Sequence, residues 1–438
     1  MYRQYRPSLL SKTMIITLRY GTSGISIDYE ETPGFVGVLN PVEAEALLDP
    51  QRELARSLLE PIDTKPLADI ARGRKDACIV ISDSTRPAPN SLMLPEILQV
   101  LEATGIPSSR ILILIATGMH RSSTPQEKQA LVGADIAERY RVIDHDARDR
   151  ANMIEVGRIG DNVAALVNHL YVEADLKILT GFIEPHMWAG FSGGRKAIVP
   201  GISSLEMLTY VHGPDMIAHP KTDYGELTGN LFHEAALAVM KMAGADFIVN
   251  VTMNSRKEIT GIFSGHPVDA HLQGCRQLAQ HCIVELSKPL DFIVTTNGGA
   301  PLDCNLYQTT KGITAAAGVV KPGGDILVAS ECCEGVGSAE YRSILEMVDS
   351  PKHFIWRVMA KEFFILDQWC AQETYQVMLD RRVTVCTQGI DSRDLERYHF
   401  FTAGKIEQAI ERLLEKHGPN ARWAVVPNGP YVIVRLRK

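Results

Sequence analysis

The side chains best suited to chemistry in this chain gather in one glycine-rich stretch, Gly181–Gly201, which contains Ser192-Gly193-Gly194-Arg195-Lys196. The apolar run Leu176–Thr180 before it predicts a buried strand, and Ser203–Val211 after it predicts a helical segment. A glycine-rich loop between a strand and a helix can bind anions, because bare backbone N–H groups approach the ligand closely. The spacing matches neither the Walker phosphate loop nor the dinucleotide fingerprint, so a flexible surface loop with a basic tip is the alternative.

Two histidines lie in loops that follow predicted strands. His120 comes after the apolar run Arg110–Ala116, and His186 lies within the glycine-rich stretch. Imidazole exchanges protons near neutral pH, so two of them facing one pocket would form an acid/base pair. Two structural histidines are the alternative. Lys196 could hold a phosphate, act as a Schiff-base nucleophile or be solvated. His212 could ligate a metal or cap the preceding helix, where a cationic ring suits the helix dipole.

Further charged and aromatic side chains have two interpretations each. After the apolar run Ala77–Ser82, Arg86 could clamp a carboxylate, while Asp83 could orient it or cap the following turn. Tyr307 and Lys311 lie at helical spacing and could face a cleft, although an ordinary amphipathic helix has the same pattern. Trp369 is typical of a core or interface position.

Continuous apolar runs alternate with helical periodicity along most of the chain. This pattern predicts an α/β fold with mainly parallel sheets covered on both faces. Three loops of interest follow predicted strands, at 83–87, 117–121 and 181–196. Ligands of open α/β sheets bind at the carboxyl ends of strands, so these loops can converge on one crevice.

We expect two α/β domains with an active-site cleft between them. Residues 1–286 would form the N-terminal cofactor-binding domain, and residues 287–417 the C-terminal domain. The final segment, 418–438, would pack back on the first domain and close the cleft. Residues 1–13 precede the first plausible strand and would be an extension or a misassigned start.

The composition excludes several classes of protein. The 438 residues are 45% hydrophobic and 22% charged, as in soluble globular proteins. The net charge of −7 without a long basic run argues against a nucleic-acid partner, and no run reaches the roughly 18 apolar residues of a membrane span. The basic N-terminus lacks the apolar core of a secretory signal. Eight cysteines without a C-x-x-C pair predict reduced thiols in a cytoplasmic protein. Oligomeric state stays open.

Several segments together carry a resemblance to a known family. They are GFIEPH…AGFSGGRK…PGI at 181–202, DSTRP at 83–87, ATGMHR at 116–121, PLDCNLYQTTKG at 301–312 and LDQW at 366–369. In this order and spacing, the sequence resembles the nickel-pincer lactate racemase family of 2-hydroxy-acid racemases and epimerases. The resemblance runs from about Met14 to the C-terminus.

The resemblance implies a nickel-pincer nucleotide, the pyridinium-3-thioamide-5-thiocarboxylic acid mononucleotide that carries Ni(II). Lys196 matches the lysine that is tethered to it covalently, and His212 matches the nickel ligand. His120 and His186 match the acid/base histidines. The other residues implied to bind the cofactor are Ser192, Gly193, Gly194, Arg195, Asp83, Thr85 and Trp188. Those implied to bind the substrate are Arg86, Tyr307, Gln308, Lys311 and Trp369.

The implied reaction is racemisation by hydride transfer. Hydride leaves the α-carbon for the cofactor while a histidine takes the hydroxyl proton, and the planar 2-keto acid then receives hydride on its other face. Each histidine would serve one enantiomer.

The expected partners are a small 2-hydroxy acid and the enzymes that make the cofactor. A 2-hydroxy-acid dehydrogenase with the same cofactor and a non-catalytic cofactor-binding protein are the alternatives, and the presence of both histidines favours racemisation. Lactate racemases carry two phenylalanines where this chain has Met187 and Trp188, so lactate or another 2-hydroxy acid is the expected substrate.

Overall fold

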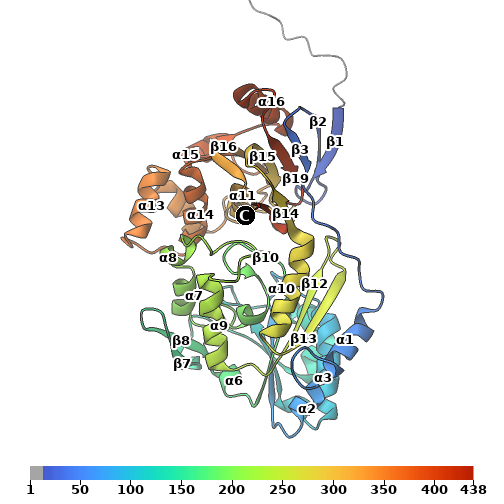
Figure 1. Cartoon of the computed structure of the whole chain (residues 1–438). Coiled ribbons are helices and arrows are strands. Elements are labelled where there is room, and N and C mark those ends of the chain that lie inside the picture. The colour runs from blue at the N-terminus through green and yellow to red at the C-terminus, as the bar shows by residue number, and fades with distance from the viewer. Residues whose placement is uncertain (1–12, 438) are drawn as a thin grey trace, which may run out of the picture. The chain divides into compact units, whose positions relative to one another are not determined.

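The computed structural model describes residues 13–437, which form two compact units. The central unit comprises residues 42–281, and the flanking unit combines residues 13–41 with 282–437. Figure 1 follows the chain by colour through both. Each unit contains a six-stranded sheet, so the predicted α/β class with mainly parallel sheets is confirmed. No helix within residues 13–437 is long and apolar enough to cross a bilayer.

The sheet of the central unit is parallel except for one edge strand, which runs antiparallel to its neighbour. In spatial order its strands are β13 (Ile259–Gly265), β12 (Phe247–Met253), β9 (Leu176–Phe182), β4 (Ala77–Ser82), β5 (Ile111–Ala116) and β6 (Arg141–Asp144). Ile79 and Ile81 of β4 pack in the core with α3, whereas Cys78 and Val80 point to the opposite face, and all four are fully buried. Burial on both faces explains why these strands are uninterrupted apolar runs.

Several helices of the central unit begin where the sequence supplies a side-chain cap. Asp49 accepts a hydrogen bond from Arg52 N, 3.0 Å, and Pro50 opens α1 (Pro50–Leu59). Thr124 and Glu127 form a capping box at the start of α4 (Pro125–Val132). The other helices are α2 (Leu67–Ala71), α3 (Asn90–Ala103), α5 (Ala134–Arg139), α6 (His169–Val172), α7 (Leu205–Val211), α8 (Pro214–Ile217), α9 (Leu231–Ala243) and α10 (Asp269–Cys282). Two hairpins complete the unit, β7–β8 (Met153–Ile159, Val163–Asn168) and β10–β11 (Pro185–His186, Gly190–Phe191).

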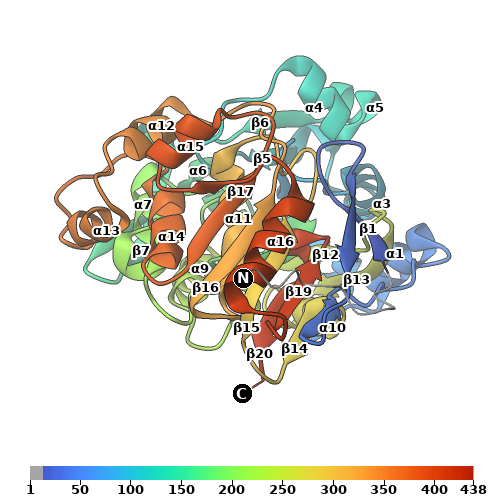
Figure 2. The same ribbon diagram turned by 90° about the horizontal axis from the view of Figure 1, so that it is seen from above.

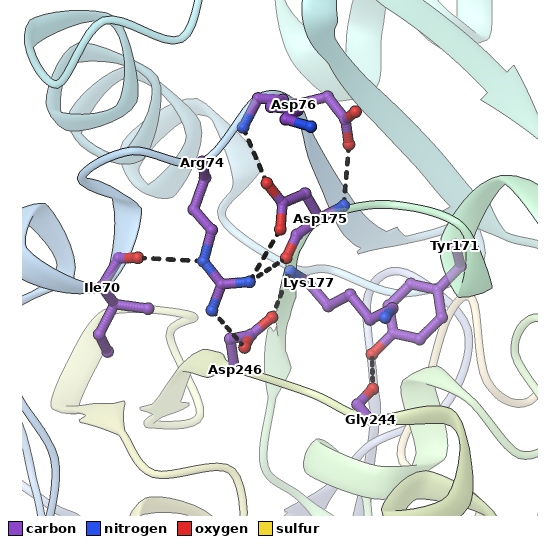
Figure 3. A network of polar contacts seen from close by, with 9 residues as sticks. Ile70, Arg74, Asp76, Tyr171, Asp175, Lys177, Gly244 and Asp246 are labelled. Atoms are coloured by element: carbon purple, nitrogen blue, oxygen red, sulfur yellow. Dashed lines mark hydrogen bonds and ion pairs between the residues drawn. The ribbon is translucent and has the colours of Figure 1, made fainter.

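One arginine joins the loops at the amino ends of three central strands (Figure 3). Arg74 Nη1 lies 3.0 Å from Asp175 Oδ1, and its Nη2 lies 3.2 Å from Asp246 Oδ1. Both carboxylates also accept backbone hydrogen bonds, Asp175 from Lys75 N at 2.9 Å and Asp246 from Lys177 N at 2.8 Å. This network fixes the beginnings of β4, β9 and β12, at the opposite end of the sheet from the glycine-rich stretch.

Replacing Arg74 by methionine is expected to lower the free energy of unfolding by about 1–2 kcal/mol. Two carboxylates lose a charged donor, but the effect is limited because the arginine side chain is 34% exposed and water can replace it. Urea denaturation of the wild-type chain and the variant measures the difference. An unchanged midpoint would show that the network contributes no net stability.

The sheet of the flanking unit is parallel throughout. In spatial order its strands are β18 (Phe401–Thr402), β17 (Arg382–Cys386), β16 (Val320–Ala329), β15 (Leu290–Thr296), β19 (Trp423–Val426) and β3 (Phe35–Val38), with the central four side by side in Figure 2. Its helices are α11 (Leu306–Ala317), α12 (Ala339–Glu346), α13 (Pro351–Met359), α14 (Gln368–Met378), α15 (Ser392–Arg397) and α16 (Ile406–His417). Trp423 stacks on Phe292, with ring centroids 5.2 Å apart, in a core that α16 helps to cover.

The expected domain division differs from the observed one at both ends of the chain. Residues 13–41 were expected in the first domain, but β3 pairs with β19, and the hairpin β1–β2 (Thr13–Leu18, Ile25–Glu30) packs on the same core. The final segment was expected to pack on the first domain. β20 (Ile433–Leu436) does pair with β14 (Ile283–Leu286), and β19 with β3, and both partners lie within residues 1–286, but they belong to the flanking unit, where β19 lies between β15 and β3. The fully apolar run Trp423–Val426 needs a hydrogen-bonded neighbour on each side, and these strands supply them. Residues 1–12, and with them nearly all of the predicted N-terminal extension, lie outside the described residues.

Candidate active site

The three loops that were expected to converge leave adjacent strands of the central sheet. Asp83 follows β4, His120 lies four residues after β5, and the glycine-rich stretch continues from β9. β4 pairs with both of the other strands, and the last residues of β4 and β5, Ser82 and Ala116, are directly opposite each other. The parallel sheet therefore places these loops at one edge.

Asp83 and His120 form a close pair across two of these loops. Asp83 Oδ2 lies 2.6 Å from His120 Nδ1, and Thr85 Oγ1 donates to Asp83 Oδ1 at 2.7 Å. The carboxylate accepts, so the proton of a neutral imidazole lies on Nδ1 and its lone pair on Nε2. The carboxylate is buried while half of the imidazole, 49%, remains exposed. His120 is thus held in the tautomer of a general base.

The pairing of Asp83 with His120 also makes the stability of the chain depend on pH in the acidic range. Burial alone would raise the pKa of Asp83, but hydrogen bonds from His120 and Thr85 and the charge of Arg86 hold that pKa below its usual value. In the unfolded chain the pKa of Asp83 is about 3.9. Its contribution to the free energy of unfolding is fully present above that pH and is lost as the pH falls through the lower pKa of the folded state. We expect the stability difference between wild type and Asp83→Asn to shrink as the pH falls below about 4. Urea unfolding at a series of pH values measures it, and a constant difference would contradict this assignment.

Arg86, predicted to clamp a carboxylate, contacts a carboxylate of the protein. Its Nη1 lies 3.4 Å from Glu184 Oε1, and 36% of its side chain is exposed. Glu184 belongs to the glycine-rich stretch, so this contact links the β4 loop to it. The long distance and the exposure leave the guanidinium able to turn toward a second anion.

His186 and Lys196 face each other within the glycine-rich stretch. His186 Nε2 lies 2.5 Å from Lys196 Nζ. The other ring nitrogen, Nδ1, accepts hydrogen bonds from the backbone N–H groups of Trp188 at 3.2 Å and Ala189 at 3.3 Å. The lysine ammonium has donors only, so N–H groups face both ring nitrogens of His186. These contacts hold the ring between Lys196 and the turn at Trp188 and Ala189.

His212 lies beside this pair and caps the preceding helix as predicted, but with a neutral ring instead of the expected cationic one. It follows the last residue of α7, and its Nδ1 lies 2.8 Å from Leu208 O, a carbonyl of the last turn. A carbonyl can only accept, so Nδ1 carries the proton and Nε2 has the lone pair that a metal ligand needs. Burial, together with the charge of Lys196, lowers the pKa of His212 to about 3, which keeps the ring neutral. Capping and metal ligation are thus compatible in this side chain.

Two aromatic side chains bring these three residues together. The Phe232 ring lies 5.4 Å from Lys196 Nζ, 6.3 Å from the His186 ring and 5.3 Å from the His212 ring. Trp188 meets the His212 ring edge-on, with centroids 4.9 Å apart and an interplanar angle of 88°. An amine and two imidazoles therefore share one largely apolar enclosure, in which electrostatic interactions are strong.

The glycine-rich loop is a tight buried turn, so the alternative of a flexible surface loop is wrong. Gly193 and Gly194 have φ values of 77° and 54°, and a Cβ atom on Gly194 would lie 2.7 Å from the His271 ring. Gly194 N donates to Asn250 Oδ1 at 2.8 Å. The Ser192 hydroxyl donates to Phe182 O and accepts from Glu184 N, both at 2.9 Å. Several hydrogen-bonding groups of the loop are thus used to hold the turn itself. They are not available to bind an anion, so the predicted anion site is smaller than the sequence suggested.

Four predicted substrate-binding residues lie in the flanking unit, on two helices. Tyr307 and Trp369 contact each other, because Trp369 Nε1 donates to Tyr307 Oη at 3.0 Å. Burial raises the pKa of Tyr307 well above its usual value. Gln308 and Lys311 lie on α11 with Tyr307, and Gln308 Oε1 is buried without a hydrogen-bond partner among residues 13–437. That orphaned acceptor is suited to a donor on a ligand.

Sequence reasoning missed several residues that shape the site, namely Phe232, Asn250, His271 and His233. Asn250 could have been identified from the sequence, because a side-chain amide in the middle of the apolar run Phe247–Met253 must find hydrogen-bond partners. Phe232 could not, since an apolar residue in an amphipathic helix is ordinary. Burial lowers the pKa of His271 well below its usual value, and burial with the Arg195 charge lowers that of His233 to about 3.

Comparisons with known proteins cover both units. The family models described as the lactate racemase N-terminal domain and C-terminal domain match residues 20–225 and 286–434. A lactate racemase from Thermoanaerobacterium thermosaccharolyticum is 35% identical over 96% of this chain and 99% of its own length. One from Lactiplantibacillus plantarum is 34% identical over 89% of this chain and 92% of its own.

Solved structures support the same relationship. The lactate racemase apoprotein from T. thermosaccharolyticum matches with a TM-score of 0.90 and 34% identity, over 96% of this chain and all of that one. A protein from Thermotoga maritima, with a TM-score of 0.68 and 19% identity over 90% of this chain and all of its own, shares the fold. The expected family and enzyme class, an isomerase, are therefore confirmed. The chain belongs to the lactate racemase family.

Proposed function

We propose that this enzyme racemises lactate, or a closely related 2-hydroxy acid, by moving hydride and proton separately. The observation that carries the proposal is the state of His120, which is bonded through Nδ1 to the buried carboxylate of Asp83 and presents the lone pair of a general base. His186 lies in the loop that continues from β9, a strand that pairs with β4, from which the Asp83 loop leaves. A racemase that works on both enantiomers needs a group that can take the hydroxyl proton of each.

The described residues fit a nickel-pincer nucleotide as cofactor. Lys196 offers a primary amine for a covalent tether, and His212 offers a neutral imidazole with its lone pair on Nε2. Within residues 13–437, no group of three or more His, Cys, Asp and Glu side chains could hold a metal. One imidazole beside one amine suits a cofactor that brings its other nickel ligands itself. When bound, the cofactor supplies a hydride acceptor and donor for the α-carbon of the hydroxy acid.

The protein's own residues would then handle the proton and the carboxylate. His120 would take the hydroxyl proton at Nε2, and Asp83 would stabilise the resulting imidazolium through its 2.6 Å contact with Nδ1. His186 would take the hydroxyl proton of the other enantiomer at Nε2. Arg86 would bind the substrate carboxylate, since its contact with Glu184 is long and partly exposed.

A chiral assay tests the function directly. The chain is co-expressed with cofactor-making enzymes and incubated separately with L-lactate and D-lactate, and with a panel of other 2-hydroxy acids. Both lactate enantiomers are expected to approach the same equal mixture. Inversion of another panel member, without inversion of lactate, would change the assigned substrate and leave the proposed reaction in place. Accumulation of keto acid with an external acceptor, without inversion, would instead identify a dehydrogenase.

Nickel binding is expected to depend on a single imidazole. His212→Ala should retain the covalent organic group but lose its nickel, because the remaining ligands belong to the cofactor. Elemental analysis and intact-protein mass measure the two quantities on one sample. His353→Ala, which changes a histidine with a 48% exposed side chain in the flanking unit, should keep both. Full nickel occupancy in His212→Ala would refute this ligand.

A further inference from the structure

We infer that Asn250 is a positioning residue for Lys196, which it fixes through the Gly193–Gly194 peptide of the glycine-rich loop. Its consequence for cofactor loading rests on the proposed function, but its effect on the position of the lysine does not. Asn250 lies in the middle of β12 and is fully buried. Asparagine is depleted in strands, and a buried side-chain amide needs hydrogen-bond partners. The partners of this amide show what it holds.

The side chain of Asn250 leaves β12 on the face where the glycine-rich loop contacts it. Val249 and Val251 pack in the core with α3, so Asn250 points to the opposite face, because successive strand residues alternate. The residue directly opposite it on β9 is Gly181. A Cβ atom on Gly193 would lie only 2.6 Å from Asn250 Oδ1. The loop can approach the amide this closely because residue 193 has no side chain.

A peptide group of the loop links Asn250 to the Lys196 backbone. Asn250 Oδ1 accepts a hydrogen bond from Gly194 N at 2.8 Å, while its Nδ2 donates to Val249 O at 2.9 Å. Gly193 O accepts from Lys196 N at 3.2 Å. Gly194 N and Gly193 O belong to the same planar peptide, so fixing its N–H also fixes the direction of its carbonyl. Asn250 therefore orients the acceptor to which the Lys196 backbone is bonded.

A second side chain holds the same carbonyl. Arg195, predicted to bind the cofactor, is turned inward, and only 1% of the residue is exposed. Its Nη1 donates to Gly193 O at 3.3 Å, and its Nη2 donates to Ala189 O at 2.5 Å. The peptide that precedes Gly194 is thus held at its N–H by Asn250 and at its carbonyl by Arg195.

This turn matters because it directs the lysine side chain. Lys196 Nζ lies 2.5 Å from His186 Nε2 and 5.4 Å from the centre of the Phe232 ring. His186 is held separately, by two backbone amides of its own turn. Nζ therefore meets the imidazole only while the turn that carries Lys196 stays in place. Without the acceptor on Asn250, the buried N–H of Gly194 would favour another conformation of that turn, since an unpaired buried donor is costly.

The lysine side chain can be observed by nuclear magnetic resonance of the full chain, expressed without the cofactor-making enzymes. Lysine is labelled with ¹³C at its ε-carbon, and the Lys196 signal is identified by its loss in Lys196→Arg. Asn250→Leu keeps the volume of the side chain but not the acceptor, whereas Asn250→Asp keeps the acceptor. Thr252→Val is the matched control. Thr252 points to the same face of β12 and is 1% exposed, but its Oγ1 lies 2.9 Å from Thr260 Oγ1.

The Phe232 ring should shift the Lys196 signal of the wild type away from the signals of solvated lysines. Thr252→Val should keep this shift, Asn250→Leu should lose most of it, and Asn250→Asp should recover most of it. An unchanged Lys196 signal in Asn250→Leu would overturn the inference, and so would an equal loss in Thr252→Val. If Asn250→Leu does not fold, Asn250→Ala takes its place, with the same expected and contradicting results.

Covalent loading gives a second, separate readout. During co-expression with the cofactor-making enzymes, Asn250→Leu should acquire the covalent group about 10-fold more slowly than wild type, because its amine is seldom in place. Thr252→Val should load at the wild-type rate, and intact-protein mass over time measures both. Loading of Asn250→Leu at the wild-type rate would also overturn the inference. A lost Lys196 shift in Asn250→Leu, in a chain whose wild type acquires no cofactor, would leave the positioning role intact and defeat only the proposed function.

Discussion

Lys196→Arg is expected to abolish covalent loading of the cofactor and, with it, all racemisation above background. Arginine keeps the positive charge and much of the length of lysine, but its guanidinium is not a nucleophilic amine that can form the tether. The loss should therefore be complete rather than graded. His186 and His212 would remain in place, because Phe232 and the backbone contacts at their Nδ1 atoms hold them independently of Lys196.

Intact-protein mass after co-expression with the cofactor-making enzymes measures loading. Lys241→Arg is the matched control, because Lys241 is exposed on α9, the helix that carries Phe232. It should load fully. A cofactor-sized mass increment on Lys196→Arg would place the tether on another residue, and noncovalent loading with retained activity would show that no tether is needed.

The central sheet could be predicted closely because its strands are buried on both faces. β4 and β12 have the same bounds as the apolar runs in the sequence, Ala77–Ser82 and Phe247–Met253. The sequence of residues 41–60 has helical periodicity throughout, but α1 begins only at Pro50, where Asp49 supplies the cap.

Pairings between distant segments could not be read from the sequence. β3 pairs with a strand nearly 400 residues later, and no local pattern specifies that partner. The same limit applies to the site. His120 and His186 could be selected because each follows a strand in an α/β pattern, but the carboxylate beside His120 and the amine beside His186 depend on tertiary contacts. Arg195 shows the limit most clearly, since a basic residue at a loop tip is normally exposed and this one is buried.

Those tertiary contacts lead to the second large effect. His120→Asn and His186→Asn are each expected to lower kcat for racemisation by about 10²–10⁴-fold, starting from either enantiomer. Asparagine can hydrogen-bond but cannot take up or release a proton near neutral pH. Enantiomers have equal free energies, so kcat/KM must fall by the same factor in both directions. Steady-state racemisation therefore cannot tell which histidine serves which enantiomer.

A single-turnover experiment separates the two histidines. Loaded enzyme in excess over L- or D-lactate is quenched at early times, and bound keto acid is measured with wild type as reference. Nickel content and cofactor mass are verified on each sample, so that a difference reports proton transfer alone. His120→Asn should form keto acid normally from one enantiomer and slowly from the other, and His186→Asn should show the opposite preference, because each variant keeps the base for one face. Loss of keto acid from both enantiomers in one variant, with no loss in the other, would replace the two-histidine scheme by a single base that serves both faces.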